Sequence, residues 1–142
     1  MLNPDYIVGL VDGEGSFTAY ILNPYSKKNR ARRVRVEPRF YLKLNEGDKK
    51  ILYELKKFFS CGNVYFQRDK RENHQNCYRY EVTNRGNLEG IIIPFFKKHH
   101  LKMPSRMNDF RVFCEIIKRI KKREHLTNKG LKRLYLLKQK MH

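Results

Sequence analysis

Cysteine and long apolar runs are both scarce in this sequence of 142 residues, and each scarcity excludes a class of protein. The three cysteines, Cys61, Cys77 and Cys114, form no Cys-x-x-Cys pair, so they predict neither a disulfide framework nor a zinc site. The longest uncharged apolar run, residues 91–96, is interrupted by Pro94 and is far shorter than the ~20 residues of a membrane span. The N-terminus also lacks a basic-then-apolar export signal. We therefore expect an intracellular protein with reduced thiols, in the cytoplasm of a prokaryote or in an organelle matrix.

Acidic residues are scarce as well, with 14 Asp and Glu against 32 Lys and Arg. The resulting net charge of +18 and the pI near 10.0 predict a polyanionic partner, bound through neutralised phosphates. Composition alone does not separate a ribosomal protein, an RNA chaperone, a DNA binder and a nuclease. The length suits a single domain over residues 1–142, and neither linkers nor internal repeats divide it.

The N-terminal residues predict a short helix that ends near Asp12. Asn3 can cap it and Pro4 suits its first position. Its other residues are apolar nearly all round, so the helix must be covered on several sides. Gly9 and Gly13 stand four residues apart on one face, where they allow another backbone to approach closely.

Alternating polar and apolar residues predict strands from Gly15 to Ile21 and, after a basic loop, from Arg33 to Leu44. The second strand has an apolar face that runs from Val34 to Leu44. Its other face is polar and mainly basic: Arg33, Arg35, Glu37, Arg39, Tyr41 and Lys43. Such a row is typical of a surface that reads a DNA groove, with simple solvation as the alternative.

A helix after Asp48 and two more strands repeat this pattern. In those strands Val64 and Phe66 are expected to point inward, and Tyr65, Gln67, Arg79 and Glu81 outward. We then expect a short helix over residues 86–93, stopped by Pro94, a longer one over residues 106–122, and a last one from about Thr127. The predicted order is αββαββα with extra C-terminal helices, an α+β fold.

Two carboxylates, Asp12 and Glu14, flank Gly13 at the end of the first helix, where free carbonyls and the helix dipole favour a cation. Such oxygen ligands suit Mg²⁺, although a pair of this kind is more often a cap and a surface charge. A histidine-based nuclease is disfavoured, because none of the histidines has metal-ligand spacing. They are His74, His99, His100, His125 and His142.

Residues 7–15, Ile-Val-Gly-Leu-Val-Asp-Gly-Glu-Gly, followed by Ser16-Phe17, closely resemble the motif that names the LAGLIDADG homing endonucleases. The similarity covers roughly residues 4–122 and includes several shorter segments: Pro38-Arg39-Phe40, Cys61-Gly62-Asn63-Val64, Tyr78-Arg79-Tyr80, Pro94-Phe95-Phe96, Leu101 and Asp109-Phe110. The resemblance implies the fold of that family, with a saddle-shaped antiparallel sheet on DNA. It also implies an intron-encoded, site-specific endonuclease that cuts both strands of a long pseudo-palindromic site by metal-dependent phosphodiester hydrolysis, leaving 3′ overhangs with 5′ phosphates.

The motif occurs once, and a copy that offers one active carboxylate needs a second copy to cut both strands, so the resemblance implies a homodimer. The expected interface comprises Tyr6, Val8, Gly9, Asp12 and Gly13. By resemblance, Glu14 binds the catalytic metal, Gly13 offers its carbonyl, and Asp12 mainly caps at the interface. Aspartate is commoner in the family at the position of Glu14.

Further roles follow from the resemblance. Asn45 matches a position that orients the attacking water, and Lys49 matches a nearby basic residue. Lys102 is our choice for the lysine that faces the scissile phosphate, with Arg106 as its rival, because the spacing around Pro104 departs from the family pattern. The implied cofactor is Mg²⁺, with Mn²⁺ as an alternative and Ca²⁺ supporting binding without turnover.

Double-stranded DNA is the expected partner. The expected DNA-binding residues are Ser16, Thr18, Tyr20, Lys27, Lys28, Arg30, Arg33, Arg35, Glu37, Arg39, Tyr41, Lys43, Tyr65, Gln67, Arg79 and Glu81. Two other interpretations stay open: an intron RNA maturase built on the same fold, and a non-catalytic basic nucleic-acid-binding protein of the ribosomal kind.

Overall fold

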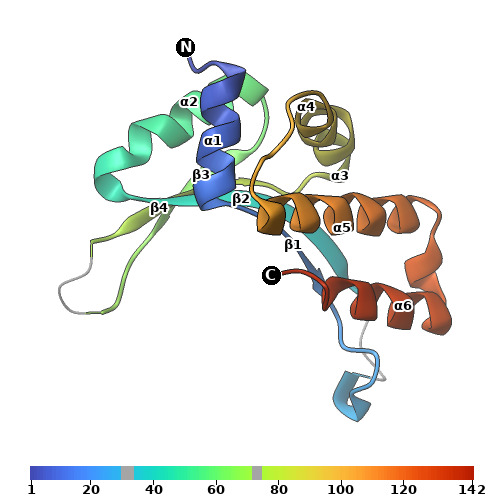
Figure 1. Ribbon diagram of the computed structural model, residues 1–142. Helices are drawn as coiled ribbons and strands as arrows, with labels where there is room; N and C mark the ends of the chain where they lie inside the picture. The colour runs from blue at the N-terminus through green and yellow to red at the C-terminus, as the bar shows by residue number, and fades with distance from the viewer. Residues whose placement is uncertain (30–33, 72–74) are drawn as a thin grey trace.

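A computed structural model of the chain describes residues 1–29, 34–71 and 75–142 (Figure 1). The expected DNA contacts Arg30 and Arg33 lie outside these described residues. The strands are β1 (Gly15–Ile21), β2 (Val36–Asn45), β3 (Asn63–Gln67) and β4 (Cys77–Val82). The α-helices are α1 (Pro4–Glu14), α2 (Lys49–Phe59), α3 (Arg85–Asn87), α4 (Ile93–Lys98), α5 (Pro104–Lys121) and α6 (Asn128–Lys138). Shorter helical turns are η1 (Lys27–Asn29), η2 (Glu46–Asp48), η3 (Leu88–Ile92) and η4 (Glu124–Leu126).

The strands form one antiparallel sheet in the order β1-β2-β4-β3. Helices α1, α2, α4 and α5 lie over one face of this sheet and leave the other face open (Figure 1). The predicted αββαββα order with extra C-terminal helices is therefore confirmed. Among the described residues, no helix combines the length and apolar character that a membrane crossing requires.

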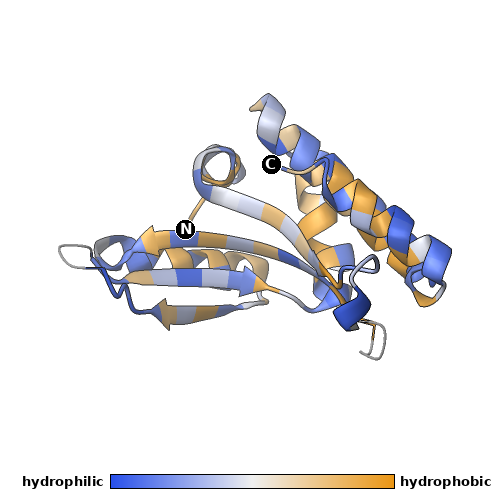
Figure 2. Cartoon of the chain, turned by 90° about the horizontal axis from the view of Figure 1, so that it is seen from below, coloured by the Kyte–Doolittle hydropathy of each residue, from blue (hydrophilic) through white to orange (hydrophobic). Residues whose placement is uncertain are grey.

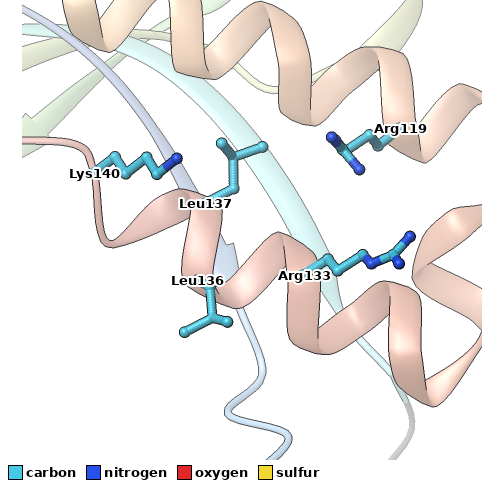
Figure 3. A pocket seen from close by; sticks show the side chains of 5 residues that line it. All are labelled: Arg119, Arg133, Leu136, Leu137 and Lys140. Carbon is cyan, nitrogen blue, oxygen red and sulfur yellow. The ribbon is translucent and has the colours of Figure 1, made fainter.

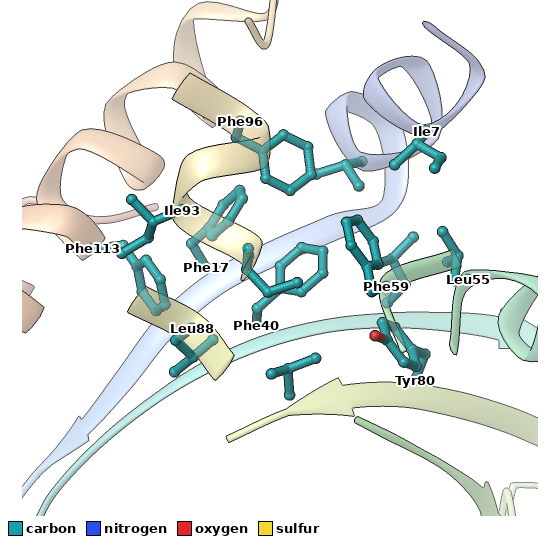
Figure 4. Packing of buried hydrophobic residues seen from close by; sticks show 14 of the residues in the cluster. Ile7, Phe17, Phe40, Leu55, Phe59, Tyr80, Leu88, Ile93, Phe96 and Phe113 are labelled. Carbon is teal, nitrogen blue, oxygen red and sulfur yellow. The ribbon is translucent and has the colours of Figure 1, made fainter. Parts of the chain in front are cut away.

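Alternation along the strands places the core between the sheet and the helices. Phe17 of β1 and Phe40 of β2 are almost fully buried beneath Phe96 of α4 and Phe113 of α5, and Tyr80 of β4 is buried beneath Phe59 of α2 (Figure 4). The rings of Phe17 and Phe40 lie 5.0 Å apart, and Phe96 meets Phe17 edge-on at 5.5 Å. Burying each such side chain contributes about 1.5–3 kcal/mol. This packing holds the strands in register and so fixes the open face.

The predicted cap of α1 is confirmed, whereas Asp48, at the N-cap of α2, makes no capping hydrogen bond with its side chain. The Asn3 side chain accepts a hydrogen bond from the amide of Tyr6 at 2.8 Å, with Pro4 in the first turn of α1. Thr127 likewise caps α6 by accepting from the amide of Gly130 at 3.0 Å. Helix α1 extends two residues beyond Asp12 and passes into β1 without a loop.

Prolines do not stop helices where the sequence predicted. Pro94 stands in the first turn of α4, directly after the π-helical turn η3, in which the Ile93 amide bonds the Leu88 carbonyl. A proline in the first turn of a helix needs no amide donor, so the chain stays helical to Lys98. Pro104 opens α5 for the same reason, two residues before the expected start.

Two residues that were predicted to point inward are exposed, and each lies at the margin of the sheet. Phe66 is 53% exposed because it lies on the edge strand β3, where it contacts the ring of Tyr78 at 5.4 Å. Val34 is 39% exposed and precedes β2, which begins at Val36. The expected inward face thus holds only where helices cover the sheet.

Candidate active site and nucleic-acid interface

Glu14 is the last residue of α1 and its side chain is exposed. In the described part of the chain it has no hydrogen-bond or ion-pair partner. Gly13 beside it is exposed too, and its carbonyl lies beyond the helical hydrogen bond that joins the Gly15 amide to the Val11 carbonyl. An unpaired carboxylate at the negative end of a helix dipole is electrostatically suited to hold a cation.

Asp12 behaves differently from Glu14. It is only 7% exposed, and its carboxylate accepts hydrogen bonds from the backbone amides of Lys102, at 3.0 and 3.2 Å, and Met103, at 3.2 Å. The carboxylate expected to cap at an interface between copies is thus already satisfied within its own chain. These bonds bring residues ninety positions apart together at the candidate active site.

Lys102 and Arg106, the two candidates for the phosphate-facing cation, are in different environments. Lys102 has an exposed side chain, with no partner among the residues that the structure describes. Arg106 is 19% exposed; its Nε donates to the Asp12 carbonyl at 3.3 Å, and its Nη1 lies 3.8 Å from a carboxylate oxygen of Asp109. The ammonium group of Lys102 is therefore available to another molecule, whereas the guanidinium group of Arg106 is already bonded within the protein.

Asn45 and Lys49 lie at the same end of the sheet as Glu14. Strand pairing sets Gly15 opposite Leu42, three residues before Asn45 at the end of β2. Asn45 is exposed, and the Lys49 ammonium lies 5.2 Å from the centre of the Tyr78 ring. The strand register thus places Asn45, with Lys49 four residues after it, beyond the point where β2 pairs with the end of the motif helix.

The donor set fits a hard cation supported by other ligands. Among the described residues no group of three or more His, Cys, Asp or Glu could hold a metal by itself. At the end of α1, the described residues of one chain offer the unpaired carboxylate of Glu14 together with the Gly13 carbonyl. Mg²⁺ binds through one or two carboxylates and completes its shell with water and phosphate oxygens, so these residues fit it.

The open face of the sheet collects the polar side chains of all four strands. Cross-strand pairs set Thr18 opposite Arg39, and Arg79 opposite both Lys43 and Tyr65. The alternation is visible along the strands in Figure 2. The same register adds two residues that the sequence reasoning missed, Asn63 and Cys77. The sequence could have shown this, because each stands two residues before a predicted outward residue, Tyr65 or Arg79, and residues two apart on a strand share a face.

Acidic side chains orient the arginines on this face. Glu81 accepts from Arg39 Nε at 2.8 Å and lies 3.5 Å from Arg79 Nη2. The Arg79 guanidinium stacks over the ring of Tyr41, with its carbon 3.7 Å from the ring centre, and its buried Nε has no hydrogen-bond partner among the described residues. Stacked and paired arginines have few rotamers left, so this face is already organised for recognition.

The open face is more exposed at the end that carries Tyr20, Arg35 and Glu37 than around Glu81. Arg35 pairs with Glu37 at 3.0 Å and lies 5.1 Å from the centre of the Tyr20 ring. Lys27 and Lys28 of η1 are exposed in the loop that follows β1. An exposed ion pair contributes little to stability, so Arg35 can exchange its partner readily.

The face of α1 that carries Gly9 and Gly13 is open. A Cβ atom built on either glycine would meet nothing within 4 Å, and Tyr6 is 47% exposed. Val8 and Asp12, the other expected interface residues, are 6% and 7% exposed, because they pack within the chain. The surface that α1 offers to another molecule is therefore narrower than expected.

A second basic surface lies between α5 and α6 (Figure 3). It surrounds a pocket of about 310 Å³ lined by Arg119, Arg133, Leu136, Leu137 and Lys140. Arg119 pairs with Glu115 at 3.2 Å. This pocket contains none of the candidate active-site residues.

The model of the LAGLIDADG endonuclease family matches residues 7–117, and the chain belongs to this family. A curated relative from Neurospora crassa, probable intron-encoded endonuclease 2, is 33% identical over 134 residues, which are 94% of this chain and 28% of the relative. Probable intron-encoded DNA endonuclease 1 of Mycosarcoma maydis is 32% identical over 98 residues, 69% of this chain and 31% of the relative. The chain thus spans less than a third of either relative.

Solved structures show the same fold. The homing endonuclease I-TnaI superposes with a TM-score of 0.81 at 33% identity, over 99% of this chain and 88% of that one. I-SmaMI bound to cleaved DNA gives 0.82 at 28% identity, over 100% of this chain and 44% of that one. I-SmaMI bound to an uncleaved DNA target with calcium ions superposes with a TM-score of 0.81 at 27% identity, over 98% of this chain and 44% of that one. The chain has the LAGLIDADG homing endonuclease fold.

Proposed function

We propose that this chain is a site-specific DNA endonuclease that cuts both strands of a long pseudo-palindromic site by metal-dependent phosphodiester hydrolysis. The observation that carries the proposal is the free carboxylate of Glu14, which ends the family motif beside the open, basic face of the sheet. The relatives from fungi are named as intron-encoded endonucleases, and I-SmaMI has been solved on cleaved DNA. Products with 3′ overhangs and 5′ phosphates belong to the proposal.

The roles proposed for the site residues are those that the family resemblance implies. Glu14 and the Gly13 carbonyl would hold Mg²⁺ or Mn²⁺, with Ca²⁺ supporting binding without turnover. When bound, such an ion lowers the pKa of water and stabilises negative charge on the leaving oxygen. Lys102 neutralises charge at the scissile phosphate, Asn45 orients the attacking water, and Lys49 adds positive potential nearby.

Two chains pair in this proposal, because each contributes one free carboxylate and a duplex has two strands to cut. The open surface of α1 at Tyr6, Gly9 and Gly13 lets a second motif helix approach closely.

The open sheet face reads the DNA. Arg39 and Arg79 are held by Glu81 on the face away from the helices, where their fork-shaped donors can reach guanine edges in the major groove. The exposed lysines of η1 supply phosphate contacts, which position the duplex without reading its sequence.

The test compares Glu14→Gln with Glu54→Gln, which makes the same change on α2. Wild type and both variants are incubated with a library of DNA sites in Mg²⁺, and the cut ends are sequenced. Glu14→Gln should bind DNA in Ca²⁺ as wild type does and fail to cleave in Mg²⁺, while Glu54→Gln should do both. Cleavage by Glu14→Gln would refute the proposed role. RNA binding by wild type without DNA cleavage would favour a maturase.

A further inference from the structure

Helix α5 begins without a capping side chain of its own. Its N-cap residue is Met103, which cannot accept a hydrogen bond as Ser or Asp would, and Pro104 follows. The carboxylate of Asp12, from another helix, accepts from the amides of Lys102 and Met103, which are the N-cap residue of α5 and the residue before it. A carboxylate at the positive end of this 18-residue helix is favoured by the helix dipole.

The backbone of Asp12 is also bonded, through its carbonyl oxygen. Arg106 Nε donates to its carbonyl oxygen at 3.3 Å, and the other end of the guanidinium faces Asp109. Asp109 is only 2% exposed, and its Oδ1 accepts the His142 amide at 2.9 Å. Arg106 thus joins the end of the motif helix to a buried carboxylate of α5, and both of its contacts lie within the protein.

We propose that Asp12, Arg106 and Asp109 are positioning residues that fix the backbone carrying Lys102 relative to Glu14. Arg106 then acts through Asp12 and not through DNA. This proposal rests on the proposed function, because it concerns the alignment of two groups of the same active site. It deepens that function by showing that one residue, Asp12, connects both groups: its peptide lies two residues before Glu14, and its carboxylate binds the amide of Lys102.

A double-mutant cycle between Asp12→Asn and Lys102→Ala tests the connection. Asp12→Asn keeps one acceptor oxygen but loses the charge and the second acceptor, and should slow single-turnover cleavage in Mg²⁺ about tenfold. If Asp12 works by placing Lys102, the same change should cost about twofold at most once Lys102 is alanine. Multiplying losses would overturn the proposal.

Variants of Arg106 distinguish a positioning role from a direct contact with a DNA phosphate. Arg106→Lys keeps the positive charge but cannot reach the Asp12 carbonyl and Asp109 together, so we expect slower cleavage at unchanged DNA affinity in Ca²⁺. Asp109→Asn should behave in the same way. For Arg106→Ala the slope of log K against log salt should stay as in wild type, whereas loss of a phosphate contact would lower it by about 0.9. A lowered slope would refute the assignment.

Amide hydrogen exchange gives a readout that is independent of cleavage. The amides of Lys102 and Met103 should exchange faster in Asp12→Asn than in wild type, because their acceptor is weakened, and unchanged exchange would overturn the proposal. The Glu54→Gln variant is the control. Failure of the proposed function is recognised separately, since it would show as cleavage that survives Glu14→Gln.

Discussion

Gly9 lies on the open face of α1, and an alanine there should affect the single chain and its pairing in opposite directions. A Cβ at this position meets nothing within 4 Å, so the change adds no clash within the chain. Replacing glycine by alanine inside a helix stabilises the folded state by about 0.5–1 kcal/mol, because less backbone freedom is lost on folding. For a domain of this size 1 kcal/mol corresponds to a rise of roughly 4 °C in melting temperature.

Pairing should weaken for the same structural reason. Glycine faces let two helix backbones approach closely, and a methyl group at Gly9 must push them apart. Sedimentation equilibrium should show a larger dimer dissociation constant for Gly9→Ala, and a larger one still for Gly9→Leu. Thermal melts at concentrations below dissociation should show the gain in stability of the single chain.

Gly90→Ala is the matched control. Gly90 also lies in a helical segment with nothing within 4 Å of a built Cβ, but it belongs to η3 and not to α1, so alanine there should leave the dissociation constant unchanged. The pairing argument would be refuted by a Gly9→Leu variant that associates as tightly as wild type. It would also be refuted by a wild-type chain that cuts both strands as a monomer.

Three further predictions concern the core and the sheet face. Tyr80→Phe removes the 2.7 Å bond that Tyr80 donates to the Cys61 carbonyl, and should lower the free energy of unfolding in urea by about 1–3 kcal/mol. Burial raises the pKa of the Cys114 thiol from 9.0 to about 11, so iodoacetamide should label it slowly at pH 8, and its contribution to stability should be lost as the pH rises from 9.0 to about 11. Rapid labelling of folded protein would contradict this. Arg39→Ala should relax preference at one base pair per half-site at a cost of about 1–3 kcal/mol, whereas Lys27→Ala should weaken all sites alike; a uniform loss for Arg39→Ala would mean that sequence is read elsewhere.

Local patterns predicted the elements that local chemistry determines. The cap at Asn3, the alternation of β2 and the order of helices and strands all follow from short-range rules, and the structure confirms them. The motif at residues 7–15 predicted the family, which the family match confirms. The roles given to individual site residues stay predictions.

Features that depend on tertiary surroundings could not be predicted in the same way. The helix through Pro94 requires the π-helical turn before it, and the exposure of Phe66 requires knowing that β3 is an edge strand. The engagement of Arg106 joins residues 94 positions apart, so no local spacing reveals it. The sequence favoured Lys102 and kept Arg106 as its rival, whereas burial and hydrogen bonding show that the two side chains have different surroundings.

The geometry of a helix explains why Asp12 and Glu14 have such different surroundings. Residues two apart on an α-helix point about 200° away from each other, so their side chains do not share a face. Asp12 therefore turns inward to the amides before α5, while Glu14 turns outward to solvent. The carboxylates of Asp12 and Glu14 in one chain therefore cannot both bind the same cation. In the proposed site, any second acidic ligand would therefore come from another motif helix, which the open glycine face of α1 would let approach, or from the DNA phosphates.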